Sequence, residues 1–172
     1  MYQRLLIVVD PSPASRLAIN EGISLARALG GELLFFSVLP RYVEPVVDLP
    51  LIGSMSAAEF ESDATKDAER GLAAAMAVAD GAGIPSLRAV GVGVTPAQSI
   101  CDAALEHHCG MIVVGSAGRN AVMRLLSGSV IPGLITLASV PVLVVRHESE
   151  HAIQAPVPRA TRMPNVVPPT SH

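Results

Sequence analysis

The sequence predicts an α/β protein built around a parallel β-sheet, and three observations support this prediction. Short apolar runs alternate regularly with longer segments whose apolar residues recur at helical spacing. Aromatic residues make up 3% of the chain and Trp is absent, so aliphatic side chains must fill the interior, as in sheets of buried parallel strands. Half of the 172 residues are hydrophobic, which is enough for one domain with its own core. The alternation therefore predicts parallel strands joined by right-handed crossovers.

The five predicted strands are short runs rich in branched aliphatic residues, as expected where both faces of a strand are buried. They cover residues 4–10, 33–39, 87–94, 111–114 and 142–145. Asp10 ends the first strand, and Pro40 stops the second. The third has the weakest pattern because Gly91 and Gly93 interrupt it. Residues 40–55 show no period and are expected to form a long loop.

Four predicted helices lie between these strands, at residues 13–29, 56–81, 95–110 and 132–138. Ser12 is the expected N-cap of the first helix, because a proline follows it at the first helical position. Ser56 and Glu59 form a capping box at the start of the second helix. Thr95 and Gln98 repeat this pattern before the third helix, so the boundaries of these helices follow from local signals.

The alternation of strands and helices stops at residue 147. Residues 148–172 contain five prolines and few apolar anchors, and we expect them to form a disordered tail. A peptide that binds a partner is the alternative for this tail, although it has no Pro-x-x-Pro motif with basic and aromatic neighbours.

Composition and charge exclude several classes of protein. No apolar run approaches the roughly 20 residues of a membrane helix, and the N-terminal residues have no secretory signal, so a cytoplasmic location is expected. The net charge of −3 and the scattered arginines argue against a nucleic-acid partner. Lys66 is the only lysine and lies far from the glycine-rich segment, which excludes a Walker-type phosphate loop.

The two cysteines are predicted to be reduced, structural thiols. Cys101 and Cys109 are eight residues apart in one predicted helix, roughly 12 Å along its axis, which is too far for a disulfide. The neighbouring His107 and His108 are residue types that bind metals. Side chains of adjacent helical residues point in different directions, however, and the sequence shows no second cluster of ligands, so a metal site is not expected.

The most informative segment is residues 111–130, where an apolar strand leads into a chain of glycines and serines. Two residues separate Gly115 from Gly118, and nine further residues lead to Gly128 and Ser129. Because glycine has no Cβ, such a loop can bring its backbone N–H groups close to an anion. The segment therefore predicts a site for phosphate groups.

Asp10 is the second candidate, because ligands of an open parallel sheet bind beyond the carboxyl ends of its strands. If the first and fourth strands are neighbours, Asp10 and Gly115 face one crevice. The glycine loop would then hold phosphates, Ser129 would bond a phosphate or ribose hydroxyl, and Asp10 would bond the sugar or base. The alternatives are that Asp10 only starts a turn before Pro11 and that Ser129 only caps the last helix.

Three segments together resemble the universal stress protein family: the Val-Gly-Ser-Ala-Gly segment with its nine-residue spacing to Gly128 and Ser129, the opening Ile-Val-Val-Asp and the closing Pro-Val-Leu-Val-Val. The resemblance covers residues 3–146, and the glycine motif is typical of the family's ATP-binding branch. It implies a Rossmann-like fold, similar to that of the adenine nucleotide alpha hydrolases, with strand order 3-2-1-4-5. This order makes the first and fourth strands neighbours. The resemblance also implies that residues 1–147 form a nucleotide-binding domain.

The resemblance also implies roles for nine residues. Asp10 and Val38 belong to the adenosine end. The phosphate side comprises Gly115, Ser116, Gly118, Arg119 and Gly128, with Ser129 and Val130 on ribose or phosphate. The implied ligand is ATP, with AMP or ADP as alternatives, together with Mg²⁺. The chain departs from the family pattern at Pro11-Ser12 and at residues 94–96 and 131–133, all on the base and ribose side.

The expected function is that of a nucleotide-dependent regulator or sensor in the stress response, with at most slow hydrolysis. No Gly-x-Ser-x-Gly nucleophile motif is present, and no His falls at a predicted strand end near the crevice. The alternatives are an interaction protein of the same fold without nucleotide binding, or a phosphohydrolase. Residues 142–145 are the expected edge strand, and the family often pairs through this strand, so a homodimer is predicted.

Overall fold

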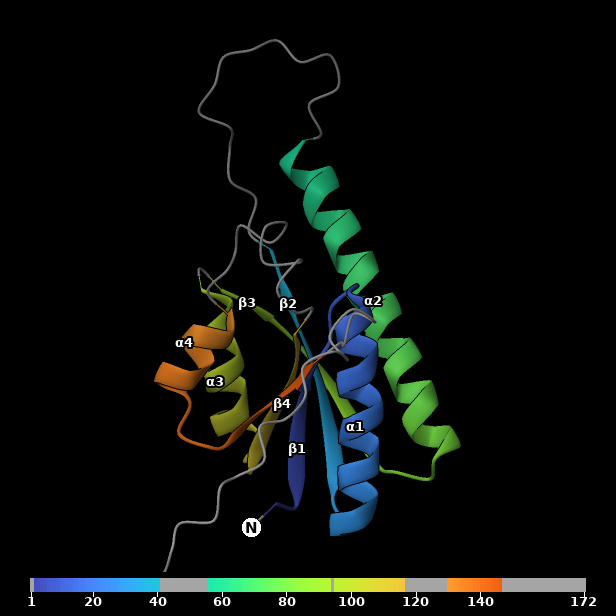
Figure 1. Ribbon diagram of the computed structural model, residues 1–172. Coiled ribbons are helices and arrows are strands. Elements are labelled where there is room, and N and C mark those ends of the chain that lie inside the picture. The colour runs from blue at the N-terminus through green and yellow to red at the C-terminus, as the bar shows by residue number, and fades with distance from the viewer. Residues whose placement is uncertain (1, 41–55, 94, 117–129, 147–172) are drawn as a thin grey trace, which may run out of the picture.

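The computed structural model describes residues 2–40, 56–93, 95–116 and 130–146 (Figure 1). Within them, five strands form one parallel sheet in the order β3-β2-β1-β4-β5, which confirms the predicted fold class and strand order. The strands are β1 (Arg4–Val8), β2 (Glu32–Leu39), β3 (Ser86–Val92), β4 (Met111–Ser116) and β5 (Val142–Arg146). The helices are α1 (Pro13–Leu29), α2 (Ala57–Gly81), α3 (Pro96–Glu106) and α4 (Val130–Leu137).

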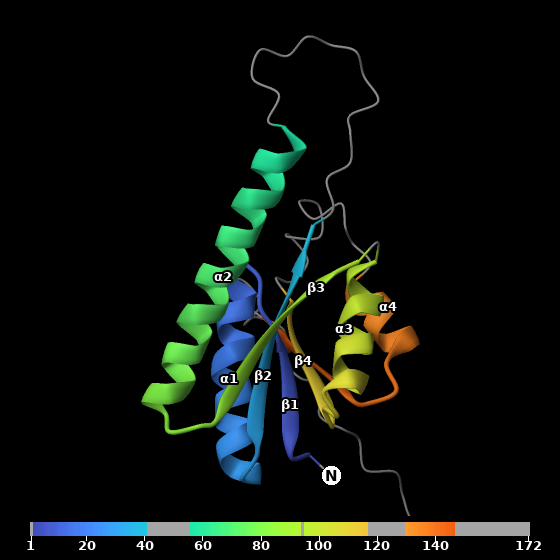
Figure 2. The ribbon, with the colours of Figure 1, turned by 180° about the vertical axis from the view of Figure 1, so that it is seen from behind.

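The helices cover the sheet on both faces. Figures 1 and 2 show α1 and α2 on one side of the sheet and α3 and α4 on the other. Side chains of one strand alternate between these faces: Leu5 and Ile7 pack among residues of α1 and α2, whereas Leu6 and Val8 pack among residues of α3 and α4. Burial on both faces explains why β1, β2 and β4 are continuous apolar runs in the sequence.

The predicted caps of α1 and α2 are confirmed. The backbone N–H of Ser15 donates to Ser12 Oγ over 3.1 Å, and Gly30 ends α1 with a φ of 65°. At the start of α2, Ser56 and Glu59 make both hydrogen bonds of the capping box. These local signals fix where each helix begins without help from tertiary contacts.

Two expectations about α3 are wrong. The helix ends at Glu106 and not near residue 110, because His108 adopts a φ of 53°. The N–H groups of His108 and Cys109 donate to the carbonyls of Leu105 and Ala104, which closes the helix as a Schellman motif with His in the usual place of Gly. Cys109 consequently lies beyond the helix that was expected to contain it.

The start of α3 also differs from the expected capping box. Thr95 takes the N-cap position but makes no side-chain hydrogen bond to the helix. Gln98 instead donates from Nε2 to Asp102 Oδ1 over 2.8 Å. A capping box would need the Gln98 side-chain oxygen to accept the Thr95 N–H, whereas here the Gln98 amide donates to a carboxylate one helical turn further on, which is a charged and therefore strong acceptor.

Smaller differences affect other boundaries. β1 ends at Val8, two residues before Asp10, and α4 begins at Val130, two residues before the predicted start. The predicted tail at 148–172 and almost all of the predicted loop at 40–55 lie outside the described residues. Among the helices that the structure describes, none combines the length and apolar character needed to cross a membrane.

The two thiols are free and buried, which confirms that they do not pair with each other. Burial raises the pKa of the Cys101 thiol, and the neighbouring Asp102 raises it further. For Cys109, burial raises the pKa to about 11, although Arg4 opposes this shift. Both groups are therefore protonated at neutral pH, and a thiol reacts far more slowly than a thiolate.

We expect neither cysteine to react at an appreciable rate with an aromatic disulfide reagent at pH 8 while the protein is folded. Each residue is only 5% exposed, and each pKa lies above that of an ordinary thiol. The measurement is the absorbance of the released thiolate, with the urea-unfolded protein as the control in which both thiols react. Rapid labelling of the folded protein would contradict the buried placement.

Candidate functional site

The candidate site lies where β1 and β4 end beside each other. These strands pair in parallel with Leu5 opposite Met111, Leu6 opposite Ile112 and Ile7 opposite Val113. Their carboxyl ends therefore lie at the same end of the sheet, which is the upper end in Figure 1. This pairing confirms the condition under which the sequence placed Asp10 and Gly115 at a common crevice.

Asp10 is held in a turn between β1 and α1. The backbone N–H of Ser12 donates to Asp10 Oδ1 over 2.7 Å, and the N–H of Asp10 donates to Ser15 Oγ over 3.0 Å. The hydroxyl of Ser15 in turn donates to the carbonyl of Val8 over 3.3 Å. The turn role that the sequence allowed for Asp10 is thus confirmed, and the residue is also exposed at the edge of the sheet.

Gly115 is required by the packing of α1 against the end of β4. A Cβ on this residue would overlap the carbonyl group of Ala14 and lie 2.8 Å from the backbone nitrogen of Ser15. The first turn of α1 therefore rests directly on the backbone of β4. The sequence assigned Gly115 to phosphate contacts, and the structure adds a steric reason for glycine that a single sequence does not reveal.

The N-terminus of α1 gives this edge a positive electrostatic character. Its first turn contains no acidic residue, but Pro13 has no N–H and the N–H groups of Ser12 and Ser15 already donate to Asp10 Oδ1 and Ser12 Oγ, so the helix contributes mainly the positive end of its dipole. Gly115 lies against that turn, and Ser116, the next residue, is the last residue of β4. β4 therefore ends beside the N-terminus of α1. Such a terminus favours an anionic group over a cation.

Val38 and Val130 contribute an apolar part on the opposite face of the sheet. Val38 is the second-last residue of β2 and Val130 is the first residue of α4. Both are half-buried and pack against the same cluster, which includes Val8, Phe36 and Val114. Both residues therefore lie on the face of the sheet that α3 and α4 cover.

Four of the nine predicted site residues lie outside the described residues, namely Gly118, Arg119, Gly128 and Ser129. Their predicted contacts with phosphate and ribose stay predictions. Within the part of the chain that the structure describes, no three His, Cys, Asp or Glu side chains are close enough to hold a metal ion. His107 lies at the end of α3, where its carbonyl accepts a hydrogen bond from Arg4.

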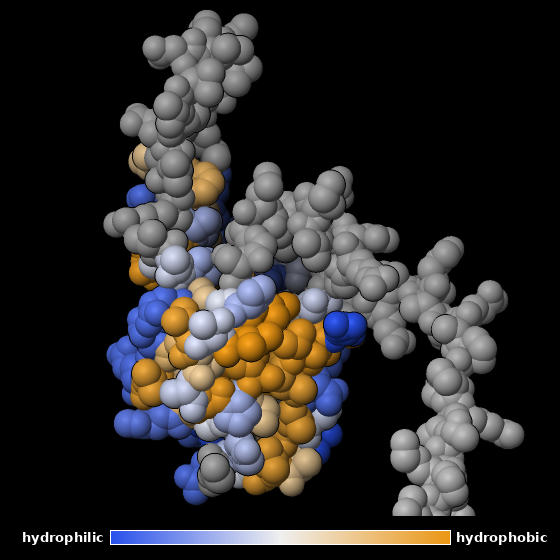
Figure 3. All heavy atoms as spheres, turned by 60° about the vertical axis from the view of Figure 1, so that its left-hand side comes forward, coloured by the Kyte–Doolittle hydropathy of each residue, from blue (hydrophilic) through white to orange (hydrophobic). Residues whose placement is uncertain are grey.

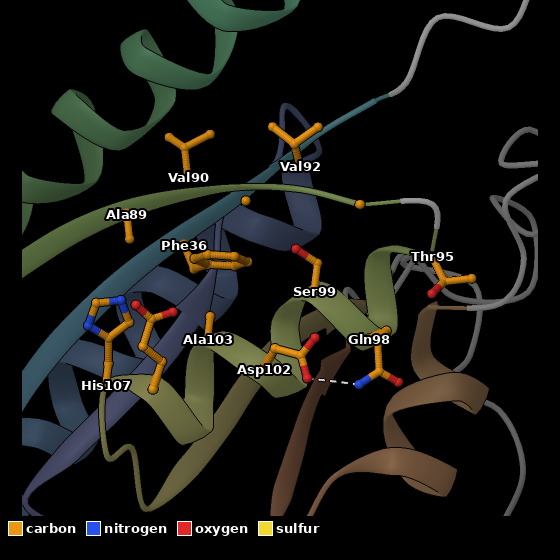
Figure 4. A pocket seen from close by; sticks show the side chains of 13 residues that line it. Phe36, Ala89, Val90, Val92, Thr95, Gln98, Ser99, Asp102, Ala103 and His107 are labelled. Carbon is orange, nitrogen blue, oxygen red and sulfur yellow. Dashed lines mark hydrogen bonds between the residues drawn. The ribbon is translucent and has the colours of Figure 1, made fainter.

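A groove of about 660 Å³, which the sequence alone did not predict, lies between β3 and α3 (Figure 4). None of the nine predicted site residues lines it. Its signals in the sequence were Gly91, which weakened the strand pattern, and the carboxylates of Asp102 and Glu106 one helical turn apart. A Cβ on Gly91 would overlap Ser99 Oγ and lie 2.5 Å from Phe36 Cζ, so this glycine allows α3 to approach β3.

Comparison with known proteins gives a single family. The model of the universal stress protein family matches residues 1–146. A universal stress protein of Methanocaldococcus jannaschii is 31% identical over 147 residues, covering 85% of this chain and 83% of that protein.

Solved structures with the same fold include nucleotide complexes. A universal stress protein family member from Burkholderia pseudomallei has a TM-score of 0.67 at 21% identity, over 84% of this chain and 96% of that one. An Arabidopsis thaliana member with AMP bound has a TM-score of 0.59 at 15% identity, over 86% and 93% of the two chains. The Archaeoglobus fulgidus protein in complex with dAMP has a TM-score of 0.58 at 20% identity, over 84% and 98%.

We expect Gly115→Ala to destabilise the protein by about 2–3 kcal/mol, because the added methyl group must push α1 away from β4. Urea unfolding followed by circular dichroism measures the change. Gly81→Ala is the matched control, since a Cβ there meets no atom within 4 Å and should leave stability unchanged or slightly higher. Equal stability of the two variants would show that α1 does not rest on Gly115.

Proposed function

This chain belongs to the universal stress protein family, and we propose that it is an ATP-binding member that acts as a nucleotide-dependent regulator or sensor in the stress response. The observation that carries the proposal is the complete spacing from Gly115 through Gly118 and Gly128 to Ser129, which starts where β4 ends beside β1. The complexes of same-fold proteins with AMP and dAMP support an adenine nucleotide as the ligand class.

The proposed arrangement divides the ligand between two chemical environments. Phosphates would bind backbone N–H groups of the glycine segment, the N-terminus of α1 and the Arg119 guanidinium. Asp10 Oδ1 already accepts the Ser12 N–H, so its other oxygen is the one available to a ribose hydroxyl. Val38 and Val130 offer apolar surface to the base. Mg²⁺ would be held mainly by the phosphates, as is usual for this ion.

We propose binding with at most slow hydrolysis. Asp10 is fixed by a backbone hydrogen bond in a turn, which orients it as an acceptor. Rapid phosphoryl transfer additionally requires groups that position a nucleophile and stabilise the charge of the transition state. The sequence around Ser116 has no nucleophile motif. His107 and His108, the histidines within the described residues, follow α3 and precede the start of β4, so they lie at the other end of the strands from Asp10.

The location and oligomeric state belong to the same proposal. We place the protein in the cytoplasm and expect a homodimer through β5. β5 is an edge strand whose four apolar residues are only half-buried, and Ile135 of α4 is 69% exposed. Figure 3, which brings forward the side of Figure 1 that carries α4, shows apolar side chains gathered on this face. A second copy would cover part of this surface.

We expect ATP with magnesium to bind the wild-type protein and Gly118→Val to abolish binding, because the valine side chain would occupy space needed by a phosphate. Isothermal titration calorimetry measures binding, and thermal unfolding should show nearly unchanged stability. Absence of binding to the wild type at millimolar ATP would favour the interaction-protein alternative. Rapid magnesium-dependent turnover that Asp10→Asn removes would favour the phosphohydrolase alternative.

We expect a mass of twice 17.8 kDa by light scattering at micromolar concentration, and a monomer for Val144→Pro. The N–H of Ile112 donates to the carbonyl of Pro141. Because alternate residues of a parallel strand bond to its neighbour, the odd-numbered residues of β5 bond to β4. Val144 therefore directs its N–H to the side of β5 that faces away from β4. Proline removes that N–H at a position where edge strands tolerate it. A dimer that persists in this variant would place the interface elsewhere.

A further inference from the structure

The other edge of the sheet is β3, and no strand of the described residues pairs with its outer side. The N–H of Leu33 donates to the carbonyl of Pro85 over 2.9 Å, with Leu33 opposite Ser86 in the register. In a parallel ladder one strand bonds to alternate residues of its neighbour, so odd-numbered residues of β3 bond to β2. Arg88, Val90 and Val92 therefore direct their N–H and C=O groups away from the sheet.

The side chains of β3 give its two faces different characters. Val90 is 44% exposed and Val92 is 68% exposed, and both point away from α3 in Figure 4. Ala89 points to the opposite side, into the groove between β3 and α3. A segment added beside β3 would thus meet an apolar surface on one face and the groove on the other.

The groove is acidic above an apolar floor. Phe36, Ala89 and Ala103 line its inner part, whereas Asp102 and Glu106 lie one helical turn apart on α3. No Lys or Arg lines the groove, and in the part of the chain that the structure describes neither carboxylate forms an ion pair. Two like charges at this spacing repel each other, and a cation placed between them would relieve the repulsion.

We propose that β3 binds an extended segment of a partner protein in which apolar and basic residues alternate. The segment would add a strand to the free edge through the backbone groups of Val90 and Val92. Its apolar side chains would cover the exposed valines. Its basic side chains alternate with the apolar ones and so point to the opposite face. They would lie over Phe36 with their charged ends at Asp102 and Glu106.

A second copy of this chain fits the same edge poorly. Two-fold pairing of β3 with itself would put both α3 helices on the same face of a continuous sheet, with the carboxylates of Asp102 and Glu106 near their counterparts. The repulsion disfavours this arrangement, whereas a basic segment gains from the same charges. The strand order also places β3 at the edge opposite β5, so the proposed dimer and the proposed peptide use separate surfaces.

The test uses the full chain and a fluorescent peptide of alternating Val and Arg, with binding followed by fluorescence anisotropy. We expect Val90→Pro to weaken binding about tenfold, because it removes one outward N–H and its hydrogen bond. Val90→Thr keeps the N–H and a branched side chain and should bind like the wild type. The double variant Asp102→Asn and Glu106→Gln should weaken binding about threefold to tenfold, as expected for two exposed ion pairs.

Four controls, two peptides and two protein variants, separate the proposal from weaker explanations. A peptide of the same composition with its Val and Arg in separate blocks, and a peptide with Glu in place of Arg, should both bind at least tenfold more weakly. Val144→Pro and Asp10→Asn alter the dimer edge and the nucleotide site and should leave peptide affinity unchanged. Equal affinity for the blocked peptide, or full binding by a correctly folded Val90→Pro protein, would overturn the proposal. So would a change of oligomeric state in Val90→Pro, which would assign the edge to a second copy.

Discussion

The parallel pairing of β1 with β4 is the interaction on which the candidate site depends. It places β1 in the centre of the sheet, so the chain runs outward to β3 and then returns across the sheet to β4. The crossovers leave in opposite directions from these two strands, and ligands of α/β sheets bind at such a point. The absence of a side chain at Gly115 lets the first turn of α1 approach the end of β4. A residue with a side chain at Gly115 would disturb the helix and the crevice together.

The site is built mainly from backbone groups and exposed polar atoms. Asp10 is tied to Ser12 by a hydrogen bond and is not buried, so holding it in place costs little desolvation energy. The positive end of the α1 dipole adjoins this edge, and the N–H groups of Ser12 and Ser15 are already held by Asp10 and Ser12.

The two edges of the sheet differ in chemistry although both carry free backbone groups. β5 and the adjoining α4 expose apolar side chains, which favours a copy of the same surface. β3 combines exposed valines with the carboxylates of α3, which favours a basic partner. The proposed nucleotide site, self-association edge and peptide-binding edge would therefore share no residues. A bound nucleotide and a bound partner would then compete for none of the same side chains.

The sequence by itself determined the order of strands and helices and the caps at Ser12, Ser56 and Gly30, because these features follow from the period and chemistry of neighbouring residues. It also supplied Asp10 and the glycine spacing, and the family resemblance supplied the strand order that the structure confirms. Only the tertiary structure decided that Gly115 makes room for α1 and that Gly91 and α3 form a groove. Contacts between segments far apart in the chain leave no local period, so a single sequence does not reveal them.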